Sequence, residues 1–290
     1  MISFLLPIYN YNVVCLVKNL TTQAKELNIP YEVLAYDDCS TIKKIQKENE
    51  EIAKIENVQY VLLNENHGRS KIRNLLARES RGEWLLFLDC DSKVNNTFIY
   101  NYLQTSKNCD CDVICGGTEY QERKEIRKEY LLHCTNGKER EYHRKQFTTN
   151  NFFIKKEVFN MLQFNENLSQ YGHEDTLFGI ELKENNYKIA YIDNPVTHLG
   201  LKNTDKFIND TILACENLKS LYNNNLYRDK IKDLSLVKAH KSLEKYHLRK
   251  LYLLCFSIIK PICIKQLHSS KPILTLLDLL KLYYFTKKTN

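Results

Sequence analysis

Two aspartates separated by one residue, Asp89-Cys90-Asp91, directly follow the apolar run 84–88. If that run is a buried strand, both carboxylates reach solvent at its carboxyl end, where they repel each other. A hard divalent cation relieves this repulsion, and Mg²⁺ or Mn²⁺ usually takes one or two protein carboxylates together with phosphate oxygens and water. The natural ligand of such a site is a diphosphate. A turn in which Asp89 caps a helix is the alternative, and the position at a strand end favours the metal site.

Glu174 and Asp175 stand just before an apolar helical run, 177–182. Negative charge at this point favours the helix dipole, and an Asp or Thr can cap the helix. A carboxylate held at a helix start can also act as a general base. The pattern leaves both readings open. His198, in Pro195-Val196-Thr197-His198-Leu199-Gly200, is likewise either a structural histidine or, as a neutral imidazole, a further metal ligand.

Alternating strand and helix patterns must position these residues. A short apolar run followed by a helical pattern occurs four times before residue 107, which predicts an α/β fold with a mainly parallel sheet covered on both faces. Ligands of such sheets bind outside the carboxyl ends of the strands. The predicted strands are 2–8, 31–36, 59–63, 84–88, 113–117, 147–154 and 188–192, and the predicted helices are 13–27, 40–55, 68–79, 96–106, 156–161, 175–185 and much of the chain after 202.

Polar residues occupy the predicted strand ends, and three of the four groups could face one crevice. The groups are Tyr9 with Asn10, Asp37 with Asp38, Asn64 with Asn66, and Asp89 with Asp91. The charged stretch 119–145 is expected to form an excursion or long loop across the sheet. Near its end, Asn150 and Asn151 are candidate partners for sugar hydroxyls.

These residues together resemble a known family. In order along the chain they are Leu5-Leu6-Pro7-Ile8-Tyr9-Asn10, Tyr36-Asp37-Asp38-Cys39-Ser40, the segment 68–74 with its Arg73-Asn74 pair, Leu88-Asp89-Cys90-Asp91-Ser92, His173-Glu174-Asp175 and His198-Leu199-Gly200. The chain resembles the family 2 glycosyltransferases of the GT-A fold over about residues 1–200. The joint order and spacing are far more specific than any single motif.

The resemblance implies a role for each matching residue. Pro7 and Tyr9 would frame the nucleotide base, Asp38 with Asp37 beside it would accept a hydrogen bond from the base, and Arg73 would lie near the nucleotide. Asp89 would contact the ribose or the sugar. Apart from the resemblance, Asn151, by its residue type, and Glu174 are further candidates for nucleotide-sugar binding. Asp91 would hold a divalent cation, Mn or Mg, to the diphosphate, assisted by His198. Asp175 would deprotonate the acceptor in a single inverting displacement.

Two positions depart from the family pattern. Cys39 stands where the family often has glycine after the aspartate pair, which puts the geometry of that turn in doubt. Ser92 stands where a further aspartate often follows the D-x-D motif, which removes a secondary contact. Neither change removes a proposed ligand.

Composition sets the remaining expectations. The chain has 290 residues, is 43% hydrophobic and has ten cysteines without even spacing. With no signal peptide before them, we expect a reducing, cytoplasmic location. Cys109, Cys111 and Cys115 lack a partner pair at zinc-site spacing. We predict a catalytic domain, 1–210, followed by a basic helical region, 211–290. Within the catalytic domain, nucleotide-sugar binding is expected in about 1–118 and the acceptor side in about 119–210.

The basic tail allows several partners. Residues 228–290 contain fourteen Lys and Arg against four Asp and Glu, a net charge of +10, so residues 1–227 carry −3. The acidic remainder argues against a nucleic-acid groove. Apolar residues recur at helical spacing in 226–290, and they either pack on the catalytic domain or a second subunit of a homodimer, or form an amphipathic anchor on the inner face of the plasma membrane. No apolar run reaches the length needed to cross a bilayer.

Three functions remain in competition. The first is transfer of a hexose or N-acetylhexosamine from a UDP-sugar to a surface-glycan or lipid-linked acceptor. The second is a sugar-phosphate nucleotidyltransferase, against which Pro7-Ile8-Tyr9-Asn10 stands where a glycine-rich phosphate loop would be expected. The third is a non-catalytic nucleotide-sugar binding module.

Overall fold

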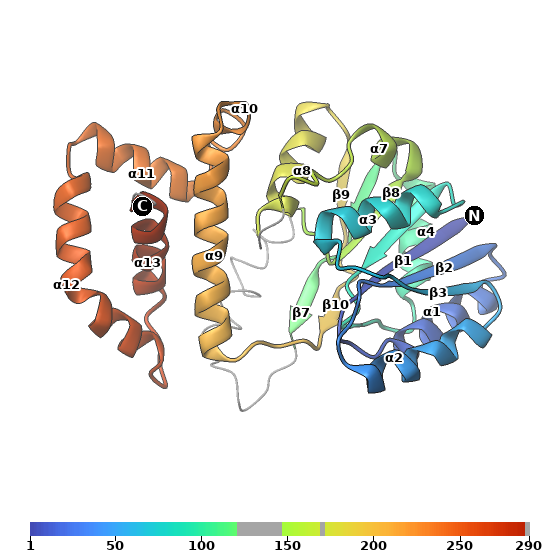
Figure 1. Ribbon diagram of the computed structural model, residues 1–290. Helices are drawn as coiled ribbons and strands as arrows, with labels where there is room; N and C mark the ends of the chain where they lie inside the picture. Colours follow the sequence, from blue (N-terminus) through green and yellow to red (C-terminus); the bar gives the residue numbers. More distant parts are fainter. Residues whose placement is uncertain (121–146, 169–171, 288–290) are drawn as a thin grey trace. The chain divides into compact units, whose positions relative to one another are not determined.

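The structure, a computed structural model, describes residues 1–120, 147–168 and 172–287 (Figure 1). The described residues form two compact units. The first holds 1–120, 147–168 and 181–200, and the second holds 172–180 and 201–287. Apart from its first two residues, the predicted excursion 119–145 lies outside the described residues.

The main sheet of the first unit has seven strands, which are β1 (Ile2–Ile8), β2 (Tyr31–Asp37), β3 (Val58–Leu62), β4 (Trp84–Leu88), β6 (Val113–Cys115), β8 (Asn151–Lys155) and β9 (Ile189–Tyr191). Their order is β3-β2-β1-β4-β8-β6-β9. β3, β2, β1 and β4 pair in parallel, as do β6 and β9, whereas β8 is antiparallel to both of its neighbours. The mainly parallel sheet predicted from the sequence is confirmed, with β8 as the one reversed strand among those described.

Helices cover both faces of this sheet, which explains why its central strands are apolar throughout. All seven residues of β2 are buried, and so are six of the seven in β1. α1 (Val14–Glu26) and α4 (Phe98–Asn108) pack on one face. α3 (Gly68–Glu79) and α7 (Lys156–Met161) lie on the other, as Figure 1 shows, while α2 (Lys43–Asn49) precedes β3. A strand buried on both faces has no polar face, which produces continuous rather than alternating hydrophobicity.

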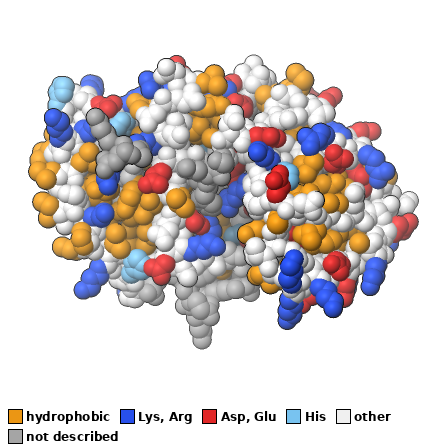
Figure 2. Space-filling model, in the orientation of Figure 1, with side chains coloured by type: hydrophobic (Ala, Val, Ile, Leu, Met, Phe, Trp, Pro, Cys, Tyr) orange, Lys and Arg blue, Asp and Glu red, His pale blue; other side chains and the backbone are white. Residues whose placement is uncertain are grey.

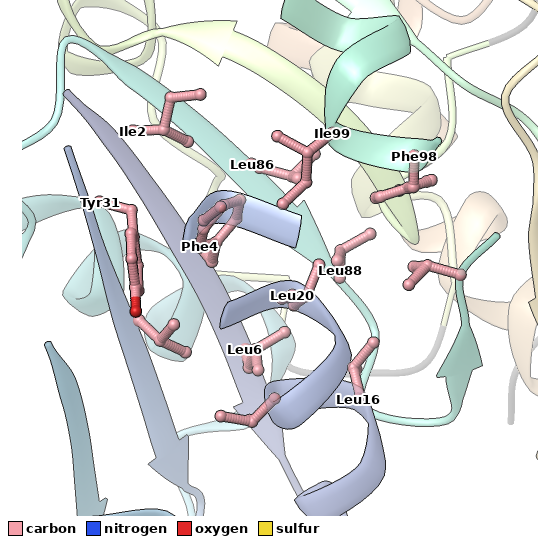
Figure 3. Close-up of a cluster of buried hydrophobic side chains, with 14 of the residues drawn as sticks. Ile2, Phe4, Leu6, Leu16, Leu20, Tyr31, Leu86, Leu88, Phe98 and Ile99 are labelled. Atoms are coloured by element: carbon pink, nitrogen blue, oxygen red, sulfur yellow. The ribbon is translucent and has the colours of Figure 1, made fainter. Parts of the chain in front are cut away.

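The core between the sheet and α1 fixes the register of the strands. Phe4 and Leu6 of β1 and Leu86 of β4 point toward Leu16 and Leu20 of α1 (Figure 3), and all five are buried. Phe4 pairs with Leu86 across the parallel ladder. Because strand side chains alternate between faces, a slip of one residue would move these side chains to the other face of the sheet, away from α1.

A second sheet of three short strands, not predicted from the sequence, completes the first unit. It consists of β5 (Ser92–Lys93), β7 (Thr118–Tyr120) and β10 (Val196–His198), in the order β5-β10-β7. β10 is antiparallel to β5 and parallel to β7. Strands of two or three residues are too short for a periodic pattern, so the sequence indicated only loops at these positions.

The second unit is helical. α8 (Glu174–Glu184) begins in it, followed by α9 (Thr204–Asn223), α10 (Asn225–Arg228), α11 (Ser235–Lys245), α12 (Arg249–Leu267) and α13 (Leu274–Thr286). Its core joins Ile208 of α9, Phe256 and Cys263 of α12, and Leu277 and Leu280 of α13. The helical character predicted for the C-terminal region is confirmed. None of the described helices is both long and apolar enough to cross a bilayer.

Replacing Phe4 with alanine should lower the free energy of unfolding of the first unit by about 3–5 kcal/mol, because a fully buried aromatic ring leaves a cavity. Trp84, the single tryptophan of the chain, lies in β4 of the same unit, so its fluorescence during urea titration reports the change. Met161→Ala is the matched control, since Met161 of α7 is 76% exposed and its loss should change the free energy by less than about 0.5 kcal/mol. Equal effects of the two substitutions would contradict this account of the core.

Candidate active site

The carboxyl ends of β1, β2 and β4 meet at one edge of the sheet because these strands are parallel. Ile8 pairs with Asp37 in register, and the amide of Asp38 donates to the carbonyl of Ile8 at 2.8 Å. β4 pairs in parallel with β1, so the segment that follows β4, which includes Cys90, begins at the same edge. Burial, aided by the charge of Asp91, raises the pKa of the Cys90 thiol to about 12, so it stays protonated. Three of the predicted strand-end groups therefore belong to one edge.

Asp37 and Asp38 both hold the polypeptide in place. The carboxylate of Asp37 is fully buried, and it accepts from the Ser40 amide at 2.7 Å and from the Tyr60 hydroxyl at 2.9 Å. Each of its oxygens is thus bonded within the protein. The carboxylate of Asp38 accepts from the amides of His67 at 2.6 Å and Gly68 at 2.9 Å, at the start of α3. Both oxygens of Asp38 are therefore also bonded within the protein, and the contact of either aspartate with a nucleotide base stays a prediction.

The turn after β2 keeps its shape despite Cys39. Cys39 has φ +60°, a left-handed conformation that glycine adopts most easily, and its amide donates to the Asp37 carbonyl at 2.9 Å. The departure from the family pattern therefore leaves a left-handed turn in place. Asn10 ties this turn to the end of β1, because its side-chain oxygen accepts from the amides of Thr41 at 2.8 Å and Ile42 at 3.1 Å.

Tyr9 and Pro7 differ in what they can offer a nucleotide. Tyr9 is 50% exposed at the strand edge, whereas Pro7 is only partly exposed within β1. An exposed aromatic ring can stack on a base, since every base has a π-face. Tyr9 is therefore suited to the framing role that the resemblance implies, and the role itself stays a prediction.

Arg73 acts on Asp89. Its guanidinium donates to a carboxylate oxygen of Asp89 at 2.8 Å, and Arg73 itself is only 4% exposed. The same guanidinium lies over the Phe164 ring, 5.8 Å from its centroid. A buried, fixed cation beside a partly exposed carboxylate sets the orientation of that carboxylate. Arg73 thus contributes to the candidate site by orienting Asp89.

Asp91 and His198 are brought together by the small sheet. His198 pairs with Ser92 in the antiparallel β10–β5 ladder, and the Leu199 amide donates to the Asp91 carbonyl at 2.8 Å. His198 Nδ1 and Asp91 Oδ1 consequently lie 3.1 Å apart. Nδ1 is buried but forms no hydrogen bond within the described structure. The Tyr120 ring packs edge-to-face against the His198 ring, with the two centroids 5.3 Å apart, on one side of the pair.

This pair fits a divalent cation. Two neighbouring ligands of an octahedral ion, each at about 2.1 Å from it, are about 3 Å apart, which matches the separation of Nδ1 and Oδ1. The buried Nδ1 of His198 forms no hydrogen bond among the described residues, which is compatible with binding a cation. The described residues contain no group of three or more His, Cys, Asp or Glu arranged to hold a metal. The protein would therefore supply two ligands here, and phosphate oxygens and water would supply the others.

The absence of a side chain at Gly200 leaves space for the Asp91 carboxylate. A side-chain carbon at this position would collide with a carboxylate oxygen of Asp91. Gly200 belongs to the His198 motif, but the sequence did not predict a role for it, because close contact between distant segments produces no periodic pattern of residues.

Asn151 is held inside the protein. Its side chain is fully buried, accepts from the Tyr102 hydroxyl at 2.5 Å, and donates to the carbonyls of Gly117 at 2.8 Å and Asn194 at 3.0 Å. These contacts favour a structural role for Asn151 over the predicted sugar contact. Asn150 differs, because its side-chain oxygen is buried without a hydrogen bond while its carbonyl accepts from the Asp89 amide at 3.1 Å.

Glu174 and Asp175 begin α8 in the second unit. The Asp175 carboxylate accepts from the amide of the next residue, Thr176, at 2.6 Å, and Glu174 is 6% exposed. His173, just before them, has φ +71°, and burial lowers the pKa of its imidazole to about 4, so it is neutral at pH 7. The proposed base role of Asp175 and sugar role of Glu174 stay predictions from the sequence.

Comparisons with known proteins agree with the pattern of the first unit. The profile of the family described as Glycosyl transferase family 2 matches residues 3–166, more than half of the chain. The chain belongs to this family. An uncharacterized glycosyltransferase of Haemophilus influenzae is 36% identical over 93 residues, which are 31% of this chain and 29% of that protein. The match therefore spans less than a third of that relative's length.

Solved structures share the fold. Staphylococcus aureus TarS matches 83% of this chain and 43% of its own at 20% identity, with a TM-score of 0.52. TarS 1–349 in complex with UDP matches 98% of this chain and 89% of its own at 17% identity, with a TM-score of 0.51. A mannosyltransferase from Pyrobaculum calidifontis, in complex with GDP-Man and Mn²⁺, matches 82% of this chain and 69% of its own at 15% identity, with a TM-score of 0.56. At these identities the likeness establishes the glycosyltransferase fold.

Gly200→Ala should weaken metal-dependent turnover of the donor at least about tenfold, because displacing the Asp91 carboxylate by even 1 Å disturbs a fixed ligand geometry. The measurement is donor turnover against Mn²⁺ concentration, with thermal unfolding as a check on the fold. Lys93→Ala, a change of an exposed side chain on β5 of the same small sheet, serves as control. If Gly200→Ala keeps the Mn²⁺ dependence of the unaltered protein, the close packing against Asp91 has no role in metal binding.

Proposed function

We propose that this protein is a metal-dependent, inverting glycosyltransferase that moves a hexose or N-acetylhexosamine from a UDP-sugar to a hydroxyl of a surface-glycan or lipid-linked acceptor. The observation that carries the proposal is the pair Asp91 and His198, with facing ligand atoms 3.1 Å apart beside the carboxyl end of β4. Such a pair suits the cation that accompanies a nucleotide diphosphate. Family membership supports glycosyl transfer as the reaction.

The choice of a uridine nucleotide rests on a likeness in fold. TarS 1–349 is similar over 98% of this chain and has been solved with UDP and with UDP-GlcNAc. The Pyrobaculum mannosyltransferase, with GDP-Man, shows that a similar fold also holds a guanosine donor. Tyr9, exposed at the strand edge, is the residue we assign to stacking on the base, and Asp38 is the carboxylate we place beside it.

The chemistry needs one displacement. The Asp175 carboxylate takes the proton of the acceptor hydroxyl, whose oxygen forms a bond to the anomeric carbon while the bond from that carbon to the phosphate oxygen breaks. The leaving nucleoside diphosphate keeps the electron pair, and the anomeric configuration inverts. A bound divalent cation would stabilise the negative charge that develops on this diphosphate.

The residues near the diphosphate have separate tasks. Asp91 and His198 are the proposed ligands of the cation. Asp89, oriented by Arg73, is proposed to contact the ribose or the sugar. A carboxylate fixed by a buried guanidinium does not have to reorganise when the donor binds, which favours precise positioning of the sugar.

Asp91→Asn should abolish the metal-stimulated part of donor turnover, because an amide is a weaker ligand of a hard cation than a carboxylate. The measurement is release of UDP from UDP-sugars with and without Mn²⁺. Asp110→Asn is the matched control, because Asp110 is an exposed carboxylate just before β6. Since β6 runs in the same direction as β4, Asp110 lies at the amino ends of these strands, at the edge of the sheet opposite the proposed site. Release of pyrophosphate in place of UDP would instead indicate a nucleotidyltransferase.

Asp175→Asn should lower the transfer rate by about 10²- to 10⁴-fold, the usual contribution of a general base, while donor affinity stays unchanged. Transfer is followed by product formation, and donor affinity by the thermal shift that the UDP-sugar produces with Mn²⁺. Transfer at the rate of the unaltered protein would refute the assignment of Asp175. A panel of UDP- and GDP-sugars in the same thermal-shift assay identifies the donor.

A further inference from the structure

α12 carries an apolar stripe that no described part of the chain covers. We define the α12 stripe as Leu251, Leu254, Ile258 and Ile262, which are 57%, 63%, 70% and 72% exposed. The spacing of three or four residues places them on one face of the helix. The apolar residues of 226–290 were expected either to pack or to form an anchor, and in the described structure Leu251 and Ile258 remain more than half exposed.

The opposite face of α12 provides the contact that holds the helix. Phe256, Cys263 and Leu267 are 2%, 3% and 0% exposed, and they join the core that α12 shares with α13 and α9. Tyr252 also donates from its hydroxyl to the Leu279 carbonyl of α13 at 2.6 Å. The helix is therefore fixed along its length on one side, and the stripe is a constant feature of the surface on the other.

The charge of α12 is of one sign. The helix contains Arg249, Lys250, Lys260 and Lys265 and no acidic residue. Lys250 and Lys265 are exposed, and their positions in the helix place them on the side of the stripe nearest Leu254. Figure 2 shows hydrophobic side chains gathered at the left edge of the view, where α12 lies in Figure 1, with basic side chains near them. An apolar face bordered by cations is complementary to a partner that has a negatively charged surface over an apolar interior.

A second copy of the chain fits this surface less well. Symmetric dimers place the same surface patch on both subunits, so α12 would meet α12 and the lysines on the stripe side, Lys250 and Lys265, would face their own copies. The stripe also lacks the aromatic, methionine and arginine side chains that are enriched in protein interfaces, since it contains only leucine and isoleucine. A lipid surface needs neither shape complementarity nor aromatic anchors. The affinity for a lipid surface increases with the aliphatic area that is buried and with basic residues beside it.

We propose that α12 docks on an anionic membrane surface, lying in the interface plane with the α12 stripe among the acyl chains and Lys250 and Lys265 at the headgroups. Long lysine side chains can bury their methylene stems and keep their ammonium groups at headgroup level. The net charge of +10 over residues 228–290 adds long-range attraction to anionic lipid, whereas residues 1–227, at −3, do not. This inference does not depend on the donor or on the metal site.

Flotation of the full chain with vesicles tests the proposal. We expect recovery with vesicles of phosphatidylcholine and 30% phosphatidylglycerol, and little with phosphatidylcholine alone, at about 0.1 M salt, where surface charges are only partly screened. The variant I258Q/I262Q should lower the partition coefficient at least about tenfold, because it removes apolar contact without adding charge. Its control is L226Q/M161Q, two side chains outside α12 that are 67% and 76% exposed and so match Ile258 and Ile262.

Each other outcome overturns the proposal. Equal recovery with neutral and anionic vesicles, or equal partitioning of I258Q/I262Q and its control, would mean that α12 is not the docking element. Absence of flotation, together with a dimer in light scattering that I258Q/I262Q dissociates, would identify a second copy as the occupant. UDP release in solution without vesicles should be the same in I258Q/I262Q and the unaltered protein. This readout separates failure of docking from failure of the proposed reaction.

Discussion

The antiparallel pairing of β5 with β10 is the constraint on which the candidate metal site depends. Asp91 precedes β5 and His198 ends β10, so backbone hydrogen bonds between two distant segments set the 3.1 Å separation of their side-chain atoms. A ladder holds such a pair more firmly than two flexible side chains could hold each other, because each strand is fixed at several points. Gly200 and Tyr120 then shape the space around the pair.

The aspartates at the sheet edge differ in how far the protein itself satisfies their carboxylates. Asp37, Asp38 and Asp89 each accept hydrogen bonds from protein donors, which offset the cost of taking a carboxylate out of water. Asp38 thereby fixes the start of α3, the helix that carries Arg73, and Arg73 fixes Asp89. The Asp91 carboxylate instead faces the imidazole of His198, whose Nδ1 forms no hydrogen bond among the described residues, and this arrangement supports the proposed metal site.

Much of this was readable in the sequence, and the exceptions have physical causes. β1, β4 and α3 were predicted to within a residue because long apolar runs and helical periodicity are local signals. β8 is shorter than predicted, since Phe147 is buried outside any strand, and β5, β7 and β10 were missed because two or three residues carry no period. Asn151 was placed on the sugar side from its residue type alone, and the contacts that bury it depend on Asn194 and Tyr102, far away in the chain.

The helical unit contains the turn before α8, from which the proposed base Asp175 emerges. Gly172 has φ +97°, and a side chain there would collide with Ala214 of α9, while the Asn217 amide of the same helix donates to the Gly172 carbonyl. α9 therefore fixes the turn from which His173, Glu174 and Asp175 emerge. The unit that presents the α12 stripe is thus the unit that holds the proposed base. If both proposals hold, the group that activates the acceptor hydroxyl is tied by a rigid helical core to the surface that meets lipid, an arrangement suited to an acceptor that is itself anchored in a membrane.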